Sequence, residues 1–223
     1  MSLILINIAV FIYQLSLAAE SSLELDRFIF AWGARPFELT NMQDIAPEIG
    51  VPIWATVFSS MFMHGGWLHI GGNMLFLWVF GDNIEDAMGH LKFLIFYLLC
   101  GIGAVVGQVL IGPDSIVPMI GASGAISGVL AAYLVLFPGG RVRVLVFIVV
   151  FVTVLSLPAV VVIGFWIVLQ FINGTAQIGP ETAQTDGVAY FAHIGGFVTG
   201  LVLVFLFRDQ RALARVRRAR SFE

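Results

Sequence analysis

Residues 121–128 read Gly-Ala-Ser-Gly-Ala-Ile-Ser-Gly, and they lie where an irregular, proline-containing segment ends and a long apolar run begins. Two interpretations compete. In the first, Gly124 and Gly128 form a small-residue face for close helix packing, and Ser123 only caps the helix. In the second, Ser123 is a nucleophile at a helix N-terminus, where unpaired backbone N–H groups can hold an oxyanion. Taken alone, the stretch favours packing, because small residues at this spacing are common in membrane helices.

The composition predicts an all-α, polytopic membrane protein. Of 223 residues, 59% are hydrophobic and only 11% are charged, which is far from the balance of a water-soluble domain. The single cysteine, Cys100, excludes a disulfide framework and a cysteine metal site. The chain has no phosphate-binding glycine loop and no basic patch with interleaved aromatic residues. We therefore expect no metal, no cofactor and no nucleic-acid partner.

Apolar runs predict a single domain of six membrane-spanning helices over residues 1–207. The spans are about 3–19, 67–81, 93–111, 123–137, 142–172 and 190–207, and a basic tail follows at 208–223. The first run competes with a signal peptide, but no basic residue precedes it, so we interpret it as a retained helix. The polar loop at 20–53 has no charge run, and we expect it to be ordered.

The basic residues support this six-span topology. If the C-terminal tail lies on the cytoplasmic side of the membrane, nine of the eleven basic residues lie on that side. Only Arg27 and Arg35 then lie on the outer side. Such a bias is typical of cytoplasmic loops, so both termini are expected to be cytoplasmic. We expect the membrane to be a bacterial or archaeal plasma membrane.

Three polar side chains are predicted to lie at a similar depth. Ser123 and His193 each lie fourteen residues before the inner end of their span, which places them about 21 Å above the inner membrane surface. The same rise per residue places His69 about 18 Å above that surface. In a hydrocarbon layer about 30 Å thick, the shared level lies about 9 Å below the outer surface. The segment 112–122 must therefore line a protein-walled, water-containing cavity.

A second ladder of small residues favours contact between Ser123 and His193. Ala192, Gly196 and Gly200 repeat at four-residue spacing, so the fourth and sixth spans can approach closely enough for the serine hydroxyl to reach the imidazole. This is the geometry of a serine activated by a histidine base. A histidine within a membrane can also be a structural hydrogen-bonder or a proton relay.

A histidine and an asparagine add polar groups to the second span. His69 and Asn73 are four residues apart and so lie on one helix face, which should point to the bundle interior. The alternative is that both only join helices through hydrogen bonds.

These motifs together resemble the rhomboid family of intramembrane serine proteases. The resemblance covers about residues 54–206 and includes Gly121-Ala-Ser-Gly124, Ala192-His-Ile-Gly-Gly196, and the series His64, His69, Asn73. It implies that Ser123 is the nucleophile and His193 the general base of a dyad without a carboxylate. It also implies that His69 and Asn73, with the Ser123 backbone N–H, stabilise the oxyanion.

Two positions depart from the family pattern. Ser127 stands where some members have a tyrosine that stacks on the histidine, which leaves open what orients His193. Ala55 follows Trp54 where many members have an arginine, which leaves open how the first loop is bonded.

The function expected from this resemblance is hydrolysis of a peptide bond in or near the transmembrane segment of another, for example single-span, membrane protein in the bilayer. The first alternative is a rhomboid-like scaffold that binds transmembrane segments without cutting them. The second is a small transporter with a polar pathway, but no embedded carboxylate or arginine is available to couple to ions.

The fifth span is expected to be the substrate gate. As one helix, residues 142–172 would extend about 46 Å, so Pro158 and Gly164 are expected to bend it. Phe165 and Trp166 fall near the level of Ser123, where they could plug a lateral opening, and the 173–187 loop could cover the cavity. Alternatively, both aromatic residues only face lipid or anchor the interface.

Overall fold

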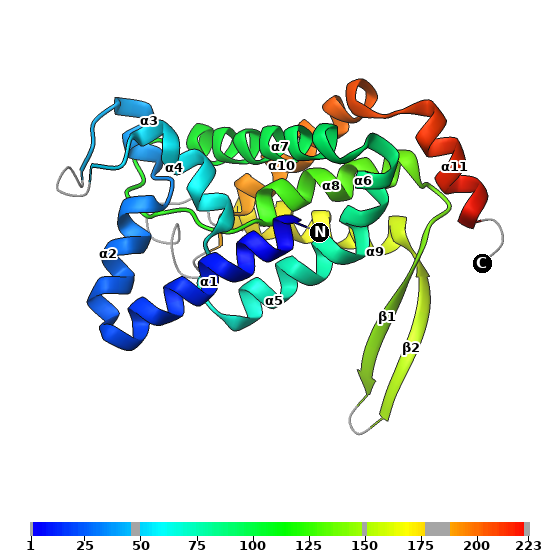
Figure 1. Ribbon diagram of the computed structural model, residues 1–223, viewed down its shortest axis with the longest axis horizontal. Coiled ribbons are helices and arrows are strands. Elements are labelled where there is room, and N and C mark those ends of the chain that lie inside the picture. The colour runs from blue at the N-terminus through cyan, green and yellow to red at the C-terminus, as the bar shows by residue number, and fades with distance from the viewer. Residues whose placement is uncertain (1, 46–49, 149–150, 177–187, 221–223) are drawn as a thin grey trace.

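The computed structural model describes residues 2–45, 50–148, 151–176 and 188–220, and Figure 1 shows how they are arranged. The elements are α1 (Ser2–Glu20), α2 (Ser22–Trp32), α3 (Pro36–Asn41), α4 (Ile53–Ser59), the 3₁₀ helix η1 (Ser60–Phe62), α5 (Trp67–Phe76), the π-helical turn η2 (Leu77–Gly81), α6 (Asp82–Met88), α7 (His90–Ile111), α8 (Ser123–Leu136), β1 (Arg141–Ile148), β2 (Phe151–Pro158), α9 (Ala159–Ala176), α10 (Tyr190–Phe207) and α11 (Gln210–Arg220).

Helix α8 is the centre of the bundle. It packs against α7, α9 and α10, and eleven of its fourteen residues are buried, including the polar Ser127. A helix that is apolar on all sides suits a protein core or a lipid environment, and the contacts of α8 place it inside the bundle. At fourteen residues it rises only about 21 Å, less than the about 30 Å of hydrocarbon. The depth of its first residue, Ser123, in the membrane stays a prediction.

The small-residue ladders bring α8 and α10 into backbone contact, as predicted. A Cβ atom built on Gly196 would lie 1.9 Å from the carbonyl oxygen of Gly124, and one on Gly200 would lie 2.4 Å from that of Gly128. The sequence analysis missed a similar approach of α7, where a Cβ on Gly107 would lie 2.9 Å from Cα of Gly195. Only glycine permits this spacing, so α10 is fixed closely against both α7 and α8.

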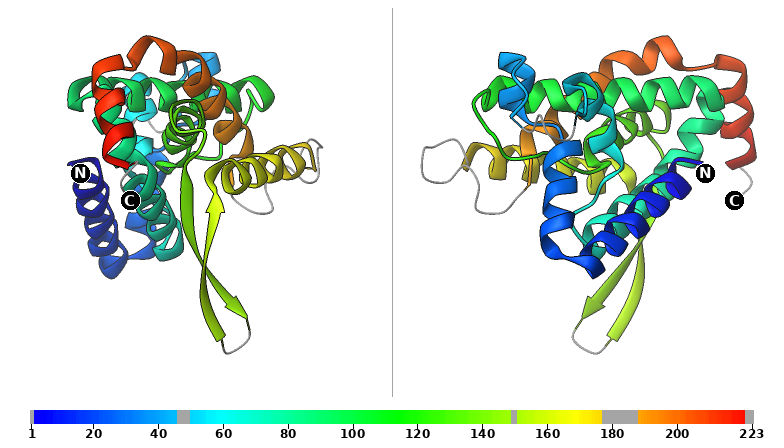
Figure 2. Two further views of the ribbon diagram at one scale, coloured as in Figure 1. Left: turned by 90° about the vertical axis from the view of Figure 1, so that its right-hand side faces the viewer. Right: turned by 60° about the vertical axis from the view of Figure 1, so that its left-hand side comes forward.

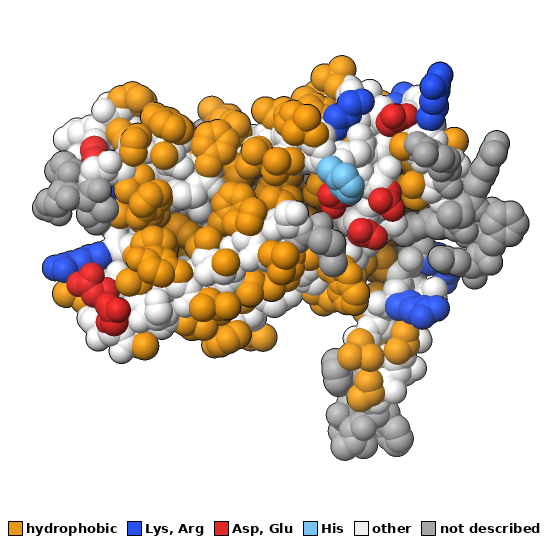
Figure 3. All heavy atoms as spheres, in the orientation of Figure 1, with side chains coloured by type: hydrophobic (Ala, Val, Ile, Leu, Met, Phe, Trp, Pro, Cys, Tyr) orange, Lys and Arg blue, Asp and Glu red, His pale blue; other side chains and the backbone are white. Residues whose placement is uncertain are grey.

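The surface is typical of a membrane protein. Four of the described helices, α1, α7, α9 and α10, are long and apolar enough to cross a membrane, while α8 is shorter. Figure 3 shows hydrophobic side chains across the middle of one face, with charged side chains towards its ends. The chain is a multi-pass membrane protein with an all-α bundle, which confirms the predicted fold class. The count of six spans stays a prediction.

The predicted fifth span, 142–172, was wrong in its first half. Residues 141–148 and 151–158 form two antiparallel strands, β1 and β2, which pair Arg141 with Pro158 and are called the hairpin below. Figure 2 shows this hairpin projecting away from the helices. The segment is rich in valine, whose branched side chain favours strands, and proline has no N–H to donate within a helix. Pro158 therefore ends β2, and α9 begins at Ala159.

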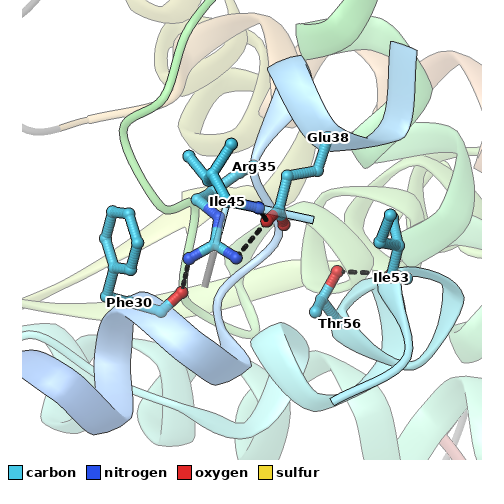
Figure 4. A network of polar contacts seen from close by, with 6 residues as sticks. All are labelled: Phe30, Arg35, Glu38, Ile45, Ile53 and Thr56. Carbon is cyan, nitrogen blue, oxygen red and sulfur yellow. Dashed lines mark hydrogen bonds and ion pairs between the residues drawn. The ribbon is translucent and has the colours of Figure 1, made fainter. Parts of the chain in front are cut away.

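The described part of the first loop, residues 20–45 and 50–53, includes the helices α2 and α3, and a buried ion pair lies within it. Arg35 and Glu38 are 2% and 1% exposed, and they form an ion pair while Arg35 also donates to the carbonyl oxygen of Phe30. Glu38 Oε1 also accepts the backbone N–H of Ile45 at 2.8 Å (Figure 4). Position 55, where many rhomboid-family members have an arginine, is alanine in this chain. The buried guanidinium of this loop comes from Arg35.

This loop also holds the segment before α8. Ala34 and Met119 exchange backbone hydrogen bonds of 3.1 and 2.8 Å, and Gly121 donates to the carbonyl oxygen of Ser60 at 2.8 Å. Irregular backbone at membrane depth is stable only when its polar groups are paired within the protein. The loop contacts therefore satisfy part of that backbone and fix the position from which α8 starts.

We predict that Gly196→Ala lowers the free energy of unfolding by at least about 2 kcal/mol, because the new methyl group would collide with the Gly124 carbonyl. Thermal unfolding in detergent, followed by circular dichroism, measures the change. Gly164→Ala in α9 is the matched control, since a Cβ there meets nothing within 4 Å. A Gly196→Ala protein as stable as this control would contradict the close packing of α8 and α10.

Candidate active site

Ser123 is the first residue of α8, and its position depends on a glycine turn. Gly121 has a φ of 129°, and a Cβ there would lie 2.7 Å from Nε2 of His69 and 3.6 Å from Oγ of Ser123. Glycine is required both by this φ and by this crowding. The N-cap position is held by Ala122, so Ser123 does not cap the helix, contrary to the simpler interpretation of this stretch. Its hydroxyl is directed elsewhere.

The Ser123 hydroxyl contacts His193 of α10. Its Oγ lies 2.7 Å from Nε2 of the imidazole, which is a hydrogen-bond distance. The two residues are seventy positions apart in the chain, and the backbone contact between α8 and α10 brings them together. The backbone N–H of the preceding Ala192 is bound by Oε1 of Gln108 at 3.2 Å, which anchors the start of α10 to α7.

The other ring nitrogen of His193 contacts a residue of α9 that the sequence analysis missed. Nδ1 lies 2.7 Å from Oε1 of Gln170, whose side chain is 7% exposed. The Trp166 ring packs on the imidazole at a centroid distance of 5.6 Å and an angle of 39°. A signal was present, because Gln170 is the only polar residue in the run 159–172 and a polar residue in a span faces the protein interior.

Ser127 does not orient His193. Its hydroxyl donates to the carbonyl oxygen of Ser123, one turn back in α8, at 2.6 Å. The aromatic packing partner of His193 comes from α9 instead, with Tyr190 of α10 in edge contact at 6.5 Å. This explains how the imidazole is held although position 127 is serine.

His69 of α5 lies beside the same turn. Its Nδ1 accepts the backbone N–H of Gly65 at 3.2 Å, and its Nε2 borders Gly121, next to Ser123. His64 packs edge-on against it at 5.1 Å. The main chain of His64 is in turn bound at both its N–H and its carbonyl oxygen by the Gln14 side chain of α1, at 2.9 and 3.1 Å.

Asn73 follows one turn after His69 and is 7% exposed. Its burial agrees with the expectation that this face of α5 points into the bundle. Its role with respect to Ser123 stays a prediction.

The two residues expected to form the gate have different surroundings. Phe165 is 67% exposed, whereas Trp166 packs on His193. They therefore do not form one plug, and each must be considered separately. Residues 177–187 of the loop expected to cover the cavity lie outside the described residues.

The arrangement is a serine, a histidine and a neutral hydrogen-bond acceptor in series, with a second histidine beside the serine. Such a series can activate a hydroxyl as a nucleophile and place a donor near the carbon that it attacks. Comparison with known proteins agrees, since the family model of the Rhomboid domain matches residues 52–210. The chain belongs to the rhomboid family.

The relatives of this rhomboid include named proteases. It is 33% identical over 146 residues to rhomboid protease AarA of Providencia stuartii, covering 59% of this chain and 48% of that protein. It is 30% identical over 172 residues to rhomboid-type serine protease 2 of Emericella nidulans, covering 75% of this chain and 30% of that protein. It is 27% identical over 179 residues to rhomboid-like protein 11, chloroplastic, of Arabidopsis thaliana, covering 76% and 58%. The chain thus spans about half the length, or less, of these relatives.

Proposed function

We propose that this rhomboid is an intramembrane serine endopeptidase that hydrolyses a peptide bond in or near the transmembrane segment of a membrane-protein substrate. The observation that carries the proposal is the 2.7 Å contact between Ser123 Oγ and His193 Nε2. Two of the relatives described above are proteases by name, which supports the same activity.

In the proposed mechanism, His193 is the general base. Neutral imidazole accepts the Ser123 proton at Nε2 while Oγ attacks the carbonyl carbon of the substrate peptide. The tetrahedral intermediate collapses to an acyl-enzyme when the imidazolium returns the proton to the leaving amine. Water, deprotonated by the same nitrogen, then attacks the ester, and the carboxylic acid product leaves as Ser123 regains its proton.

His69 is proposed to donate to the oxyanion. A neutral imidazole carries one proton, and Nδ1 of His69 already accepts the Gly65 N–H, so its proton belongs on Nε2. That N–H borders Gly121 and therefore reaches the region beside the Ser123 Oγ. We propose that Asn73 and the Ser123 backbone N–H complete the set of donors.

The proposed orientation follows from the arginine distribution. Both termini are placed in the cytoplasm of a bacterial or archaeal cell, and the site is placed about 9 Å below the outer surface of the bilayer. Six membrane spans are part of this proposal, with the fifth now beginning at α9. Substrates would then be cut near their outer membrane boundary.

A non-cleaving scaffold that binds transmembrane segments is the second candidate, because a relative such as the chloroplastic one is named only rhomboid-like. One experiment separates the two. Purified protein in detergent is incubated with a single-span reporter protein, and a cut that requires Ser123 supports the protease. Binding of the reporter without any cut, by a folded protein, would support the scaffold.

We predict that Ser123→Ala and His193→Ala each lower kcat by roughly 10³-fold or more, since the two side chains act as one unit. For the same reason the double variant should be no slower than either single variant. Reporter cleavage and reaction with a fluorophosphonate measure the loss. Substantial cleavage by folded Ser123→Ala would remove the serine from the mechanism.

We predict that His69→Ala and Asn73→Ala each lower kcat by roughly 10²-fold with little change in KM, because each donor acts on charge that develops only in the transition state. His90→Ala is a control for loss of an imidazole, as the His90 side chain is 90% exposed at the start of α7. A rise in KM at unchanged kcat would instead make His69 and Asn73 substrate contacts.

Phe165 is proposed to restrict lateral entry between α9 and the rest of the bundle. We predict that Phe165→Ala speeds cleavage of a transmembrane substrate more than that of a soluble, unfolded one, whereas Trp166→Ala slows both because His193 loses its packing partner. Phe205→Ala, a 56% exposed phenylalanine on α10, is the matched control. Equal effects of Phe165→Ala and Phe205→Ala on both substrates would remove Phe165 from the gate.

A further inference from the structure

We propose that Gln170 of α9 is a positioning residue that fixes the tautomer and orientation of His193. This inference rests on the proposed function, because it assigns to a neutral glutamine the part that a carboxylate plays in a serine–histidine–aspartate triad. The carrying observation is the 2.7 Å contact between Gln170 Oε1 and His193 Nδ1, on the side of the ring away from Ser123.

The hydrogen-bond network determines which way the Gln170 amide points. Its Nε2 donates to the carbonyl oxygen of Trp166 at 3.2 Å, and a carbonyl can only accept. The amide oxygen therefore faces His193, and the partner of an oxygen must be a donor. The network thus assigns the imidazole proton to Nδ1.

This tautomer is the one that the reaction requires. With Nδ1 protonated, Nε2 carries a lone pair and can accept the hydroxyl proton of Ser123 at 2.7 Å. The opposite tautomer would place N–H against the serine and leave no base. Because Gln170 is 7% exposed, no ready supply of water replaces its oxygen as the acceptor for Nδ1.

A neutral acceptor also suits a site inside a membrane. When His193 becomes an imidazolium, its Nδ1–H bond to the Gln170 oxygen becomes a charge-assisted hydrogen bond and strengthens. A carboxylate would stabilise the imidazolium more, but between turnovers it would be an unpaired anion buried within the membrane domain, which is unfavourable. Glutamine also places the imidazole proton on Nδ1, but it adds no negative charge.

Trp166 limits the other freedom of the ring. It precedes Gln170 by one turn of α9, and its ring packs on the face of the imidazole at 5.6 Å. The amide fixes the ring edge while the indole restricts rotation out of its plane. Both contacts come from α9, so one helix sets the geometry of the base.

The test compares Gln170→Met with Gln108→Met. Methionine keeps the length of glutamine but cannot serve as a strong acceptor. Gln108 is the matched control, because its side chain also binds α10, at the backbone N–H of Ala192. The bond lies one residue before His193 and does not involve the imidazole. We expect Gln170→Met to lower kcat roughly ten- to a hundred-fold with KM within about twofold of wild type, and Gln108→Met to keep wild-type kcat.

Two readouts separate positioning from a general loss of structure. In nitrogen-15 NMR of histidine-labelled protein, the His193 signals are those missing from the His193→Asn spectrum. They should show the imidazole protonated at Nδ1 in the wild type, and this preference for Nδ1 should be lost in Gln170→Met. Gln170→Glu keeps both contacts when its carboxyl group is protonated, because the O–H can donate to the Trp166 carbonyl while the other oxygen accepts from Nδ1. At a pH low enough to protonate this buried carboxyl group, Gln170→Glu should retain the wild-type tautomer and recover at least half of the lost kcat on a logarithmic scale.

The outcomes distinguish this proposal from the proposed function. A wild-type His193 with its proton on Nε2, or a folded Gln170→Met with wild-type kcat, would overturn the positioning role even in an active protease. Conversely, an Nδ1-protonated His193 that depends on Gln170, in a protein that cuts no reporter, would support the positioning contact and count against the protease activity.

Discussion

The contact that the whole site depends on is the backbone approach of α8 and α10. Two glycines of α10 face two carbonyl groups of α8 at distances where no side chain fits. Helices in a membrane gain nothing from excluding water, so they associate through such close packing and through hydrogen bonds. This approach sets the separation of the two helix N-termini, and with it the distance between Ser123 and His193. The contact between Ser123 and His193 is thus a consequence of helix packing, not an addition to it.

A second constraint on the fold is that irregular, polar backbone within a membrane protein needs hydrogen-bond partners. The segment before α8 is not helical, and such backbone is unstable in hydrocarbon unless the protein pairs it. Here the first loop supplies a partner at Ala34 and η1 supplies one at Ser60, and the loop is itself held by the buried Arg35 and Glu38 pair. Position 55 of this chain is alanine, and the buried guanidinium of the loop comes from Arg35.

The sequence predicted most of what depends on pattern and little that depends on side-chain geometry. Membrane class, the glycine ladders and the meeting of Ser123 with His193 all followed from composition and spacing. The hairpin 141–158 did not, because hydropathy cannot separate an apolar strand from an apolar helix, and only the valines and Pro158 favoured strands. Gln170 was missed because its effect depends on which atom its amide oxygen faces, and no spacing rule gives that.

The location of the positioning groups on α9 links substrate entry to chemistry. Helix α9 has few close backbone contacts of the kind that join α10 to α8, and a Cβ on its Gly164 meets nothing within 4 Å. The glycine-to-carbonyl contacts that fix α10 against α8 therefore do not hold α9. If a substrate enters by displacing α9, the Gln170 and Trp166 contacts to His193 are lost together, and the base is misoriented while the path is open. Cleavage would then require α9 to return around the bound segment, so that the Gln170 and Trp166 contacts to His193 seen in the structure are restored after the substrate has entered.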